Sequence, residues 1–447
     1  MRPLRFVSVA LIVLFFGSPA GAMFAAPTPA PIDRLIANTT AYIKEKPNDA
    51  HGYYTLARIH YLAFVNKSKL VPAFEREAMP QIAEDWQGPD IAYMARYRRA
   101  EELALKELGY ESRNAIPYEE RQKFHEAVKQ KRKELQEQRW APEKLADKEL
   151  FVHAGAALEN FQKAIELDSK NGLYHLGLAS LLEQYVEFLG EIEAEQVPEQ
   201  FRKFLLNEAK DIYYEAYSLS IKKDLKHRHL PLAGLASLVG YEAGNAYVRL
   251  SENLGDISRP EEKEIAKVKS NLKKLNSLPM GAITPIVFSL EKHTSLADLL
   301  AANTKVAFDL DGDGVTELRP WVNQTTGILV WDPEQKGRIT SGRQMFGSVT
   351  WWLFFKDGYH ALDALDDSRD GLLMGGELEG IRVWFDRNCD GKSRPDEVVP
   401  LAEAGIISIS TQASGKQSGC PMSTSGIILS DGRTLPTYDW VTTGSRD

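Results

Sequence analysis

Hydrophobic residues recur at helical spacing through residues 32–279. In the stretch ALENFQKAIELDSKNGLYHLGLASLLEQ, Ala157, Phe161 and Ala164 stand at positions i, i+4 and i+7, which share one face of a helix. Polar residues at 168–171 interrupt this pattern, and a second apolar series follows them. The pattern predicts a series of amphipathic helices joined by short turns.

The hydrophobic pattern changes near Pro279, Gly281 and Pro285, which mark a domain boundary. Beyond this point the helical period gives way to short apolar runs, which predict short strands, separated by Gly-rich turns and Asp-rich loops. Six of the eight tryptophans also lie there. The sequence therefore predicts a multidomain chain, with an all-α domain over 32–279 and a smaller domain over 280–447.

The helical region resembles tetratricopeptide repeats. The spacing Ala-x3-Phe-x2-Ala that begins at Ala157 returns as Ala209, Tyr213 and Ala216, and such small residues let neighbouring helices approach closely. The resemblance implies a stacked array of helices that docks a protein or peptide partner. A charged insertion at 111–150 breaks the period, so an irregular helical bundle remains the alternative.

The N-terminus combines two arginines with an apolar run of 11 residues that ends at Phe16. This run is too short to span a bilayer, and Ala20 and Ala22 fit a signal-peptidase site. We expect a signal peptide at 1–22 and a short linker at 23–31. The mature chain is then expected to be secreted or periplasmic without a membrane span; a retained membrane anchor is the alternative.

Two acid-rich turns 20 residues apart carry the most specific signal. Each has oxygen-bearing residues at positions 1, 3, 5, 7 and 12 and glycine at position 6, the spacing of an EF-hand calcium loop. Glycine is expected there because the chain must turn with a positive φ. The predicted ligands are Asp366, Ser368, Asp370, Leu372 through its carbonyl and Glu377 in the first turn, and Asp386, Asn388, Asp390, Lys392 through its carbonyl and Glu397 in the second.

A third turn, FDLDGDGVTEL, lacks the glutamate at position 12 but is also expected to bind calcium. Its predicted ligands are Asp309, Asp311, Asp313 and Glu317. A fourth turn, 332–344, has Lys336 at a ligand position and is expected to be degenerate. In the second turn, Arg394 lowers the local negative charge. Glutamates at position 12, expected on exiting helices, suit Ca²⁺ better than Mg²⁺. Solvated acidic turns without metal are the alternative.

From Thr284 to Ser410 the chain resembles the calcium-dependent module of RTX-type secreted proteins, some of which process themselves. The matching segments include FDLDGDGV, GILVWD, GRITSGRQMFG, GYHALDALD and the pair of acidic turns. The resemblance implies a small α+β domain built around EF-hand-like loops, and in self-processing members a cleavage at an Asp-Pro bond. Here Thr284 precedes Pro285, and threonine lacks the carboxylate which that cleavage needs, so self-cleavage is not expected.

The net charge and the absence of two catalytic motifs exclude some classes of function. The net charge of −8 argues against a nucleic-acid binder, and neither a G-x-S-x-G nor an H-E-x-x-H motif is present. Cys389 and Cys420 form either a disulfide or two free thiols. The sequence predicts an exported, non-enzymatic calcium-binding protein whose helices dock a protein or peptide partner. A calcium-dependent self-processing protein or a structural cell-surface component is the alternative.

Overall fold

The computed structural model describes residues 31–70, 145–192, 197–227, 236–255, 258–276, 282–291, 295–312 and 316–443, with isolated residues between 104 and 128. The chain divides into two compact units, and the first contains Thr28–Phe74 and Leu145–Asp447. The predicted signal peptide and all but the last residue of the predicted linker lie outside the described residues, as does most of the charged insertion. Those three assignments stay predictions.

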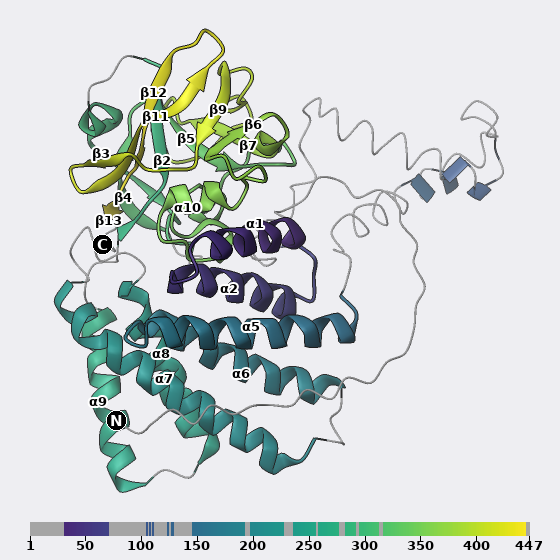
Figure 1. Cartoon of the computed structure of the whole chain (residues 1–447), viewed down its shortest axis with the longest axis vertical. Helices are drawn as coiled ribbons and strands as arrows, with labels where there is room; N and C mark the ends of the chain where they lie inside the picture. The colour runs from purple at the N-terminus through teal and green to yellow at the C-terminus, as the bar shows by residue number, and fades with distance from the viewer. Residues whose placement is uncertain are drawn as a thin grey trace. The chain divides into compact units, whose positions relative to one another are not determined.

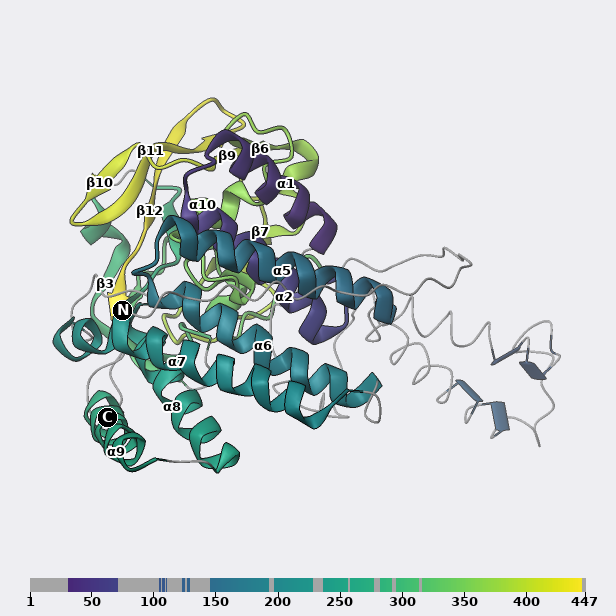
Figure 2. The same ribbon diagram turned by 60° about the horizontal axis from the view of Figure 1, so that its bottom comes forward.

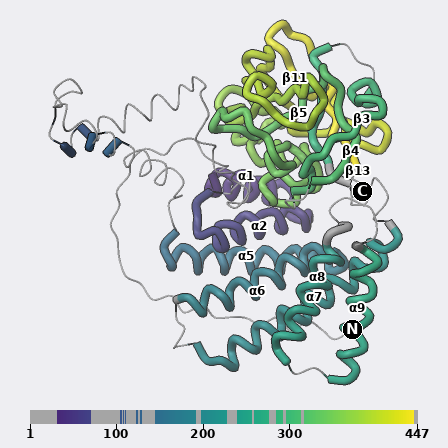
Figure 3. Tube along the Cα trace, turned by 180° about the vertical axis from the view of Figure 1, so that it is seen from behind, coloured from purple at the N-terminus to yellow at the C-terminus, as the bar shows by residue number. Residues whose placement is uncertain are grey.

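Seven helices make up the described part of the helical region, and each packs against the next along the chain (Figure 1). Figure 2 shows α5, α6 and α7 side by side, and Figure 3 shows the succession α1, α2, α5 and α6 from the opposite side. The helices are α1 Ile32–Glu45, α2 Ala50–Asn66, α5 Asp147–Leu167, α6 Gly172–Ile192, α7 Glu199–His227, α8 Ala236–Leu254 and α9 Arg259–Asn276.

The predicted apolar face of α5 is confirmed. Ala157, Phe161 and Ala164 are all fully buried. Gly177 of α6 lies against the Phe161 ring, and a Cβ atom added to it would stand 2.4 Å from that ring. Small residues are therefore needed where α5 and α6 meet.

The likeness to tetratricopeptide repeats stays unverified. Successive helices do stack, but their lengths run from 14 residues in α1 to 29 residues in α7, whereas that repeat has a constant period.

Within the described residues, no helix is both long enough and apolar enough to cross a membrane.

The second part of the chain is an all-β domain in the form of a half-barrel. A nine-stranded sheet has the order β6-β9-β11-β12-β2-β5-β7-β8, with β10 on β11, and every pairing is antiparallel. Its strands are β2 Ile286–Ser289, β5 Thr326–Trp331, β6 Leu372–Met374, β7 Ile381–Phe385, β8 Val398–Pro400, β9 Ile406–Ser410, β10 Gly415–Gln417, β11 Cys420–Leu429 and β12 Thr434–Asp439.

Two short pairs of strands complete the domain, β1 Ala282–Ile283 with β13 Thr442–Thr443 and β3 Leu300–Phe308 with β4 Glu317–Val322. In the described part of this domain the one α-helix is α10, Gly358–Asp363. Single turns of 3₁₀-helix lie at η4 Leu296–Leu299, η5 Gly342–Gln344, η6 Thr350–Trp352 and η7 Gly375–Leu378. The predicted α+β domain of EF-hand type is therefore wrong.

The central strands have apolar residues on both faces of the sheet. In β5, Leu329 and Trp331 join one core cluster, while Ile328 and Val330 join a second. A strand that is buried on both faces reads as a continuous apolar run without alternation. Short strands were therefore predicted from these runs, but the runs did not indicate that one sheet is buried on both faces.

One of these clusters continues into the helical region. It includes Ile32 of α1 and Tyr54 of α2 together with Trp351 and Phe355 of the β-domain. The helices and the half-barrel therefore share a hydrophobic core within one compact unit.

Helix α2 also holds the backbone of the aromatic segment that contains Trp352 and Phe354. The guanidinium of Arg58 donates to the Trp352 carbonyl over 3.0 Å, and His51 Nε2 lies 2.9 Å from the Phe354 carbonyl. Burial lowers the pKa of His51 to about 4, so the neutral ring donates this bond from Nε2. Trp352 and Phe354 both have a positive φ, 61° and 58°, a strained backbone that persists only where surrounding contacts fix it.

Candidate functional site

The two acidic turns begin in the same way. In the 366–377 turn, the Asp366 carboxylate accepts the amide of Gly371 over 2.9 Å. In the 386–397 turn, Asp386 accepts the amide of Gly391 over 2.7 Å. Both glycines have a positive φ, +86° and +71°, which confirms the predicted need for glycine at position 6. Each aspartate is almost fully buried and anchors its turn.

The two turns also close in the same way. The Glu377 carboxylate accepts the amides of Ser368 over 2.8 Å and Met374 over 3.0 Å. The Glu397 carboxylate accepts the amide of Arg387 over 3.3 Å. Each glutamate therefore joins the end of its turn to its beginning, at the spacing that the sequence predicted.

The elements that flank these turns differ from the prediction. The 366–377 turn follows α10 and leads into β6 and η7, and the 386–397 turn connects β7 to β8. Neither glutamate lies on an exiting α-helix. Among the residues that the structure describes, no three His, Cys, Asp or Glu side chains are grouped so that they could hold a metal ion. The prediction of a calcium-binding EF-hand is therefore wrong.

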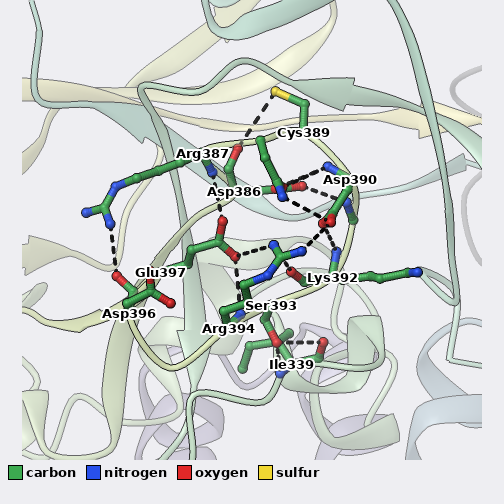
Figure 4. A network of polar contacts seen from close by, with 12 residues as sticks. Ile339, Asp386, Arg387, Cys389, Asp390, Lys392, Ser393, Arg394, Asp396 and Glu397 are labelled. Carbon is green, nitrogen blue, oxygen red and sulfur yellow. Dashed lines mark hydrogen bonds and ion pairs between the residues drawn. The ribbon is translucent and has the colours of Figure 1, made fainter.

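The 386–397 turn holds a positive charge of its own (Figure 4). Arg394 Nη2 donates to Asp390 over 2.7 Å, and its Nη1 lies 3.6 Å from the Glu397 carboxylate. The bond to Asp390 raises the pKa of Arg394. On the buried side of the turn, Trp321 Nε1 donates to Asp386 over 2.6 Å.

A buried arginine that sequence reasoning missed lies just after the 309–317 turn. Arg319 Nη2 lies 3.2 Å from the Glu317 carboxylate and 3.5 Å from that of Asp311. The Arg319 side chain is fully buried. The sequence does contain a signal for the pairing with Glu317. Arg319 lies two residues after Glu317 on β4, and alternate residues of a strand point to the same face. Of the other two predicted ligands of this turn, Asp309 is buried and Asp313 lies outside the described residues.

The fourth turn repeats the opening of the other turns. Asp332 accepts the amides of Lys336 over 3.0 Å and Gly337 over 2.8 Å. The Lys336 ammonium forms an ion pair with Glu334. A lysine therefore stands at the position where the other turns have a predicted oxygen ligand, as the sequence showed.

The 366–377 turn is bound to helix α1 of the helical region. Arg34 donates from Nε to Asp367 over 2.8 Å and from Nη2 to the Leu365 carbonyl over 2.7 Å. The amide of Asn38 donates to Asp367 over 2.7 Å and to the Ala364 carbonyl over 3.0 Å. The first residues of the turn are thereby fixed to α1.

Arg369 adds a second link between this turn and α1. Its guanidinium lies 2.8 Å from Asp363 at the end of α10 and 3.1 Å from Glu45 at the end of α1. Burial raises the pKa of Asp363. The ion pairs of this turn thus involve Asp363 and Asp367, neither of which is a predicted calcium ligand.

The two cysteines are free thiols. Cys389 Sγ lies 3.5 Å from the Val322 carbonyl, and Cys420 Sγ accepts the amide of Val441 over 3.5 Å. Burial raises the pKa of both thiols. Of the two alternatives that the sequence left open, the structure shows the unbridged one.

The β-domain is similar in sequence to known proteins. The family model of the SPM domain matches residues 287–441. The iron-regulated protein FrpA of Neisseria meningitidis serogroup C is 36% identical over 107 residues, which are 23% of this chain and 10% of that protein. The chain thus spans about a tenth of this curated relative. The helical region lies outside the residues matched by the SPM model, so the likeness to the SPM domain concerns the half-barrel alone.

Proposed function

We propose that this chain is an exported interaction protein. Its helices dock a protein or peptide partner, and the 366–377 turn holds the helices and the half-barrel together. The observation that carries the proposal is the position of this turn, whose residues Asp367 and Arg369 are bound to α1. The half-barrel therefore supports the helices that dock the partner.

The helical region offers an apolar surface for the partner. Val152 of α5 is 61% exposed and Phe204 of α7 is 42% exposed. A small cavity between α5, α6 and α7 is lined by Leu158, Tyr185 and Leu205, among others. Neither Val152 nor Phe204 lines this cavity, and exposed aromatic and aliphatic side chains of this kind can anchor a partner.

Changing Val152 and Phe204 together to glutamate should lower the retention of the partner by about tenfold or more, because the apolar anchors are replaced by charge. Retention is measured with the tagged mature chain and an envelope extract. Glu159→Gln, at an exposed position on α5, is the control. Equal retention by the double variant and the wild type places the docking surface elsewhere.

A further inference from the structure

Helix α9 has a strongly basic outer face. It packs against α7 and α8 at the edge of the helical region (Figure 2). Among the residues of α9 whose exposure the structure describes, the exposed ones include one acid, Glu262, and six basic side chains. These six are Arg259, Lys263, Lys267, Lys269, Lys273 and Lys274. Six positive charges and one negative charge give this basic face a balance of +5, in a chain whose net charge is −8.

The opposite face of α9 holds the helix in this orientation. Four apolar residues are buried in a core cluster shared with α7 and α8, namely Ile265, Val268, Leu272 and Leu275. Glu261 forms an ion pair with Lys210 of α7 over 2.9 Å. Glu264 accepts a hydrogen bond from the Tyr214 hydroxyl, also of α7. The apolar side chains and these two acids therefore point inward, and the lysines face solvent.

Three lysines of the basic face have no acidic partner in the described part of the chain. Lys269 donates to Glu252 of α8 over 2.6 Å, but no hydrogen bond or ion pair between described residues involves Lys263, Lys267 or Lys273. Lys263 and Lys267 are four residues apart on one side of the helix, and like charges at this spacing repel each other. An anionic partner on this face would relieve the repulsion.

The composition of the basic face favours a bilayer over a protein as that partner. Among its described residues none is aromatic or a large aliphatic, and the uncharged ones are Pro260, Ala266 and Ser270. Protein interfaces are depleted in lysine and depend on aromatic and apolar anchors. Clustered lysines bind anionic lipid headgroups by charge, without such anchors. Screening limits this attraction to about 8 Å at physiological ionic strength, so more distant acids of the chain do not cancel it.

We propose that the basic face of α9 binds the surface of a bilayer that contains anionic phospholipids. The lysine ammonium groups contact the lipid phosphates. The helix does not enter the hydrocarbon region, because its apolar side chains are already buried against α7 and α8. This binding does not depend on the docking surface at Val152 and Phe204.

Co-sedimentation of the mature chain with lipid vesicles tests the proposal. Phosphatidylcholine vesicles with about 30% phosphatidylglycerol should bind the chain, and vesicles of phosphatidylcholine alone should not, because only the first kind has a negative surface. Raising the salt concentration from about 0.05 M to about 0.5 M should release the bound chain, since the Debye length falls from about 14 Å to about 4 Å.

The α9 variant combines Lys263→Gln, Lys267→Gln and Lys273→Gln. It should lower the partition coefficient onto the anionic vesicles by about tenfold or more, because each lysine near such a surface contributes roughly fivefold. Arginine at the same three positions keeps the charge and should preserve binding. All three side chains are exposed, so the far-UV circular dichroism of both variants should match that of the wild type.

The matched control combines Lys170→Gln, Lys203→Gln and Lys416→Gln, at three exposed lysines outside α9. It changes the net charge by the same amount and should bind as the wild type does. The proposal is overturned if the wild type does not sediment with the anionic vesicles, or if the α9 variant and the control bind equally. Self-association that the α9 variant loses, without vesicle binding by the wild type, assigns the face to a second copy and overturns it too.

Discussion

Asp386→Ala should lower the free energy of unfolding by about 3–5 kcal/mol. The Asp386 carboxylate is fully buried and accepts three hydrogen bonds, from Trp321 Nε1 over 2.6 Å, the Gly391 amide over 2.7 Å and the Asp390 amide over 3.2 Å. Alanine leaves these donors without their acceptor in a buried place, and the desolvation cost of each is then uncompensated.

Urea unfolding followed by tryptophan fluorescence measures this loss, because the Trp321 and Trp384 rings lie 5.7 Å apart beside the turn. Asp396→Ala is the control, since Asp396 is exposed in the same turn and should change stability by less than about 0.5 kcal/mol. A loss below about 1 kcal/mol for Asp386→Ala contradicts the structural role given to this aspartate.

Arg58→Ala should have the second large effect, about 2–4 kcal/mol, and should destabilise helices and half-barrel together. Arg58 is buried, donates to the Trp352 carbonyl over 3.0 Å, and stacks over the rings of Tyr61 and Phe354 at 4.7 Å and 5.0 Å. Because both parts of the chain share one hydrophobic cluster, loss of this contact weakens the whole unit.

Two probes show whether Arg58→Ala destabilises the helices and the half-barrel together or the half-barrel alone. Far-UV circular dichroism reports chiefly on the helices, and tryptophan fluorescence reports chiefly on the half-barrel, where six of the eight tryptophans lie. Both transitions should move to lower urea concentration by the same amount, while Arg338→Ala, an exposed position, should move neither. If only the fluorescence transition moves, the two parts unfold independently.

Local features of the chain could be predicted from the sequence. The buried face of α5 followed from apolar spacing, and the positive φ of Gly371 and Gly391 followed from the geometry of an acidic turn. These features depend on residues within one or two turns of the chain. Spacing rules applied to the sequence can therefore predict the buried face of a helix and the glycine position of a turn.

Long-range features could not be predicted in the same way. Strand β2 pairs with β5 and also with β12, which lies close to the end of the chain, and no spacing rule indicates such partners. The acidic turns favoured an EF-hand because their internal spacing is the same whether strands or helices flank them. The buried pairing of Arg319 with Asp311 depends on the β3–β4 hairpin, and therefore appears only in three dimensions.

Retention of a partner by the exposed apolar side chains of the helices tests the central claim most directly. The tagged mature chain and its variant with Val152→Glu and Phe204→Glu are incubated with an envelope extract, and the retained proteins are compared. The account predicts that the wild type retains a partner which the variant loses by about tenfold or more, because both side chains are exposed on the helices. Equal retention by the two chains would contradict it.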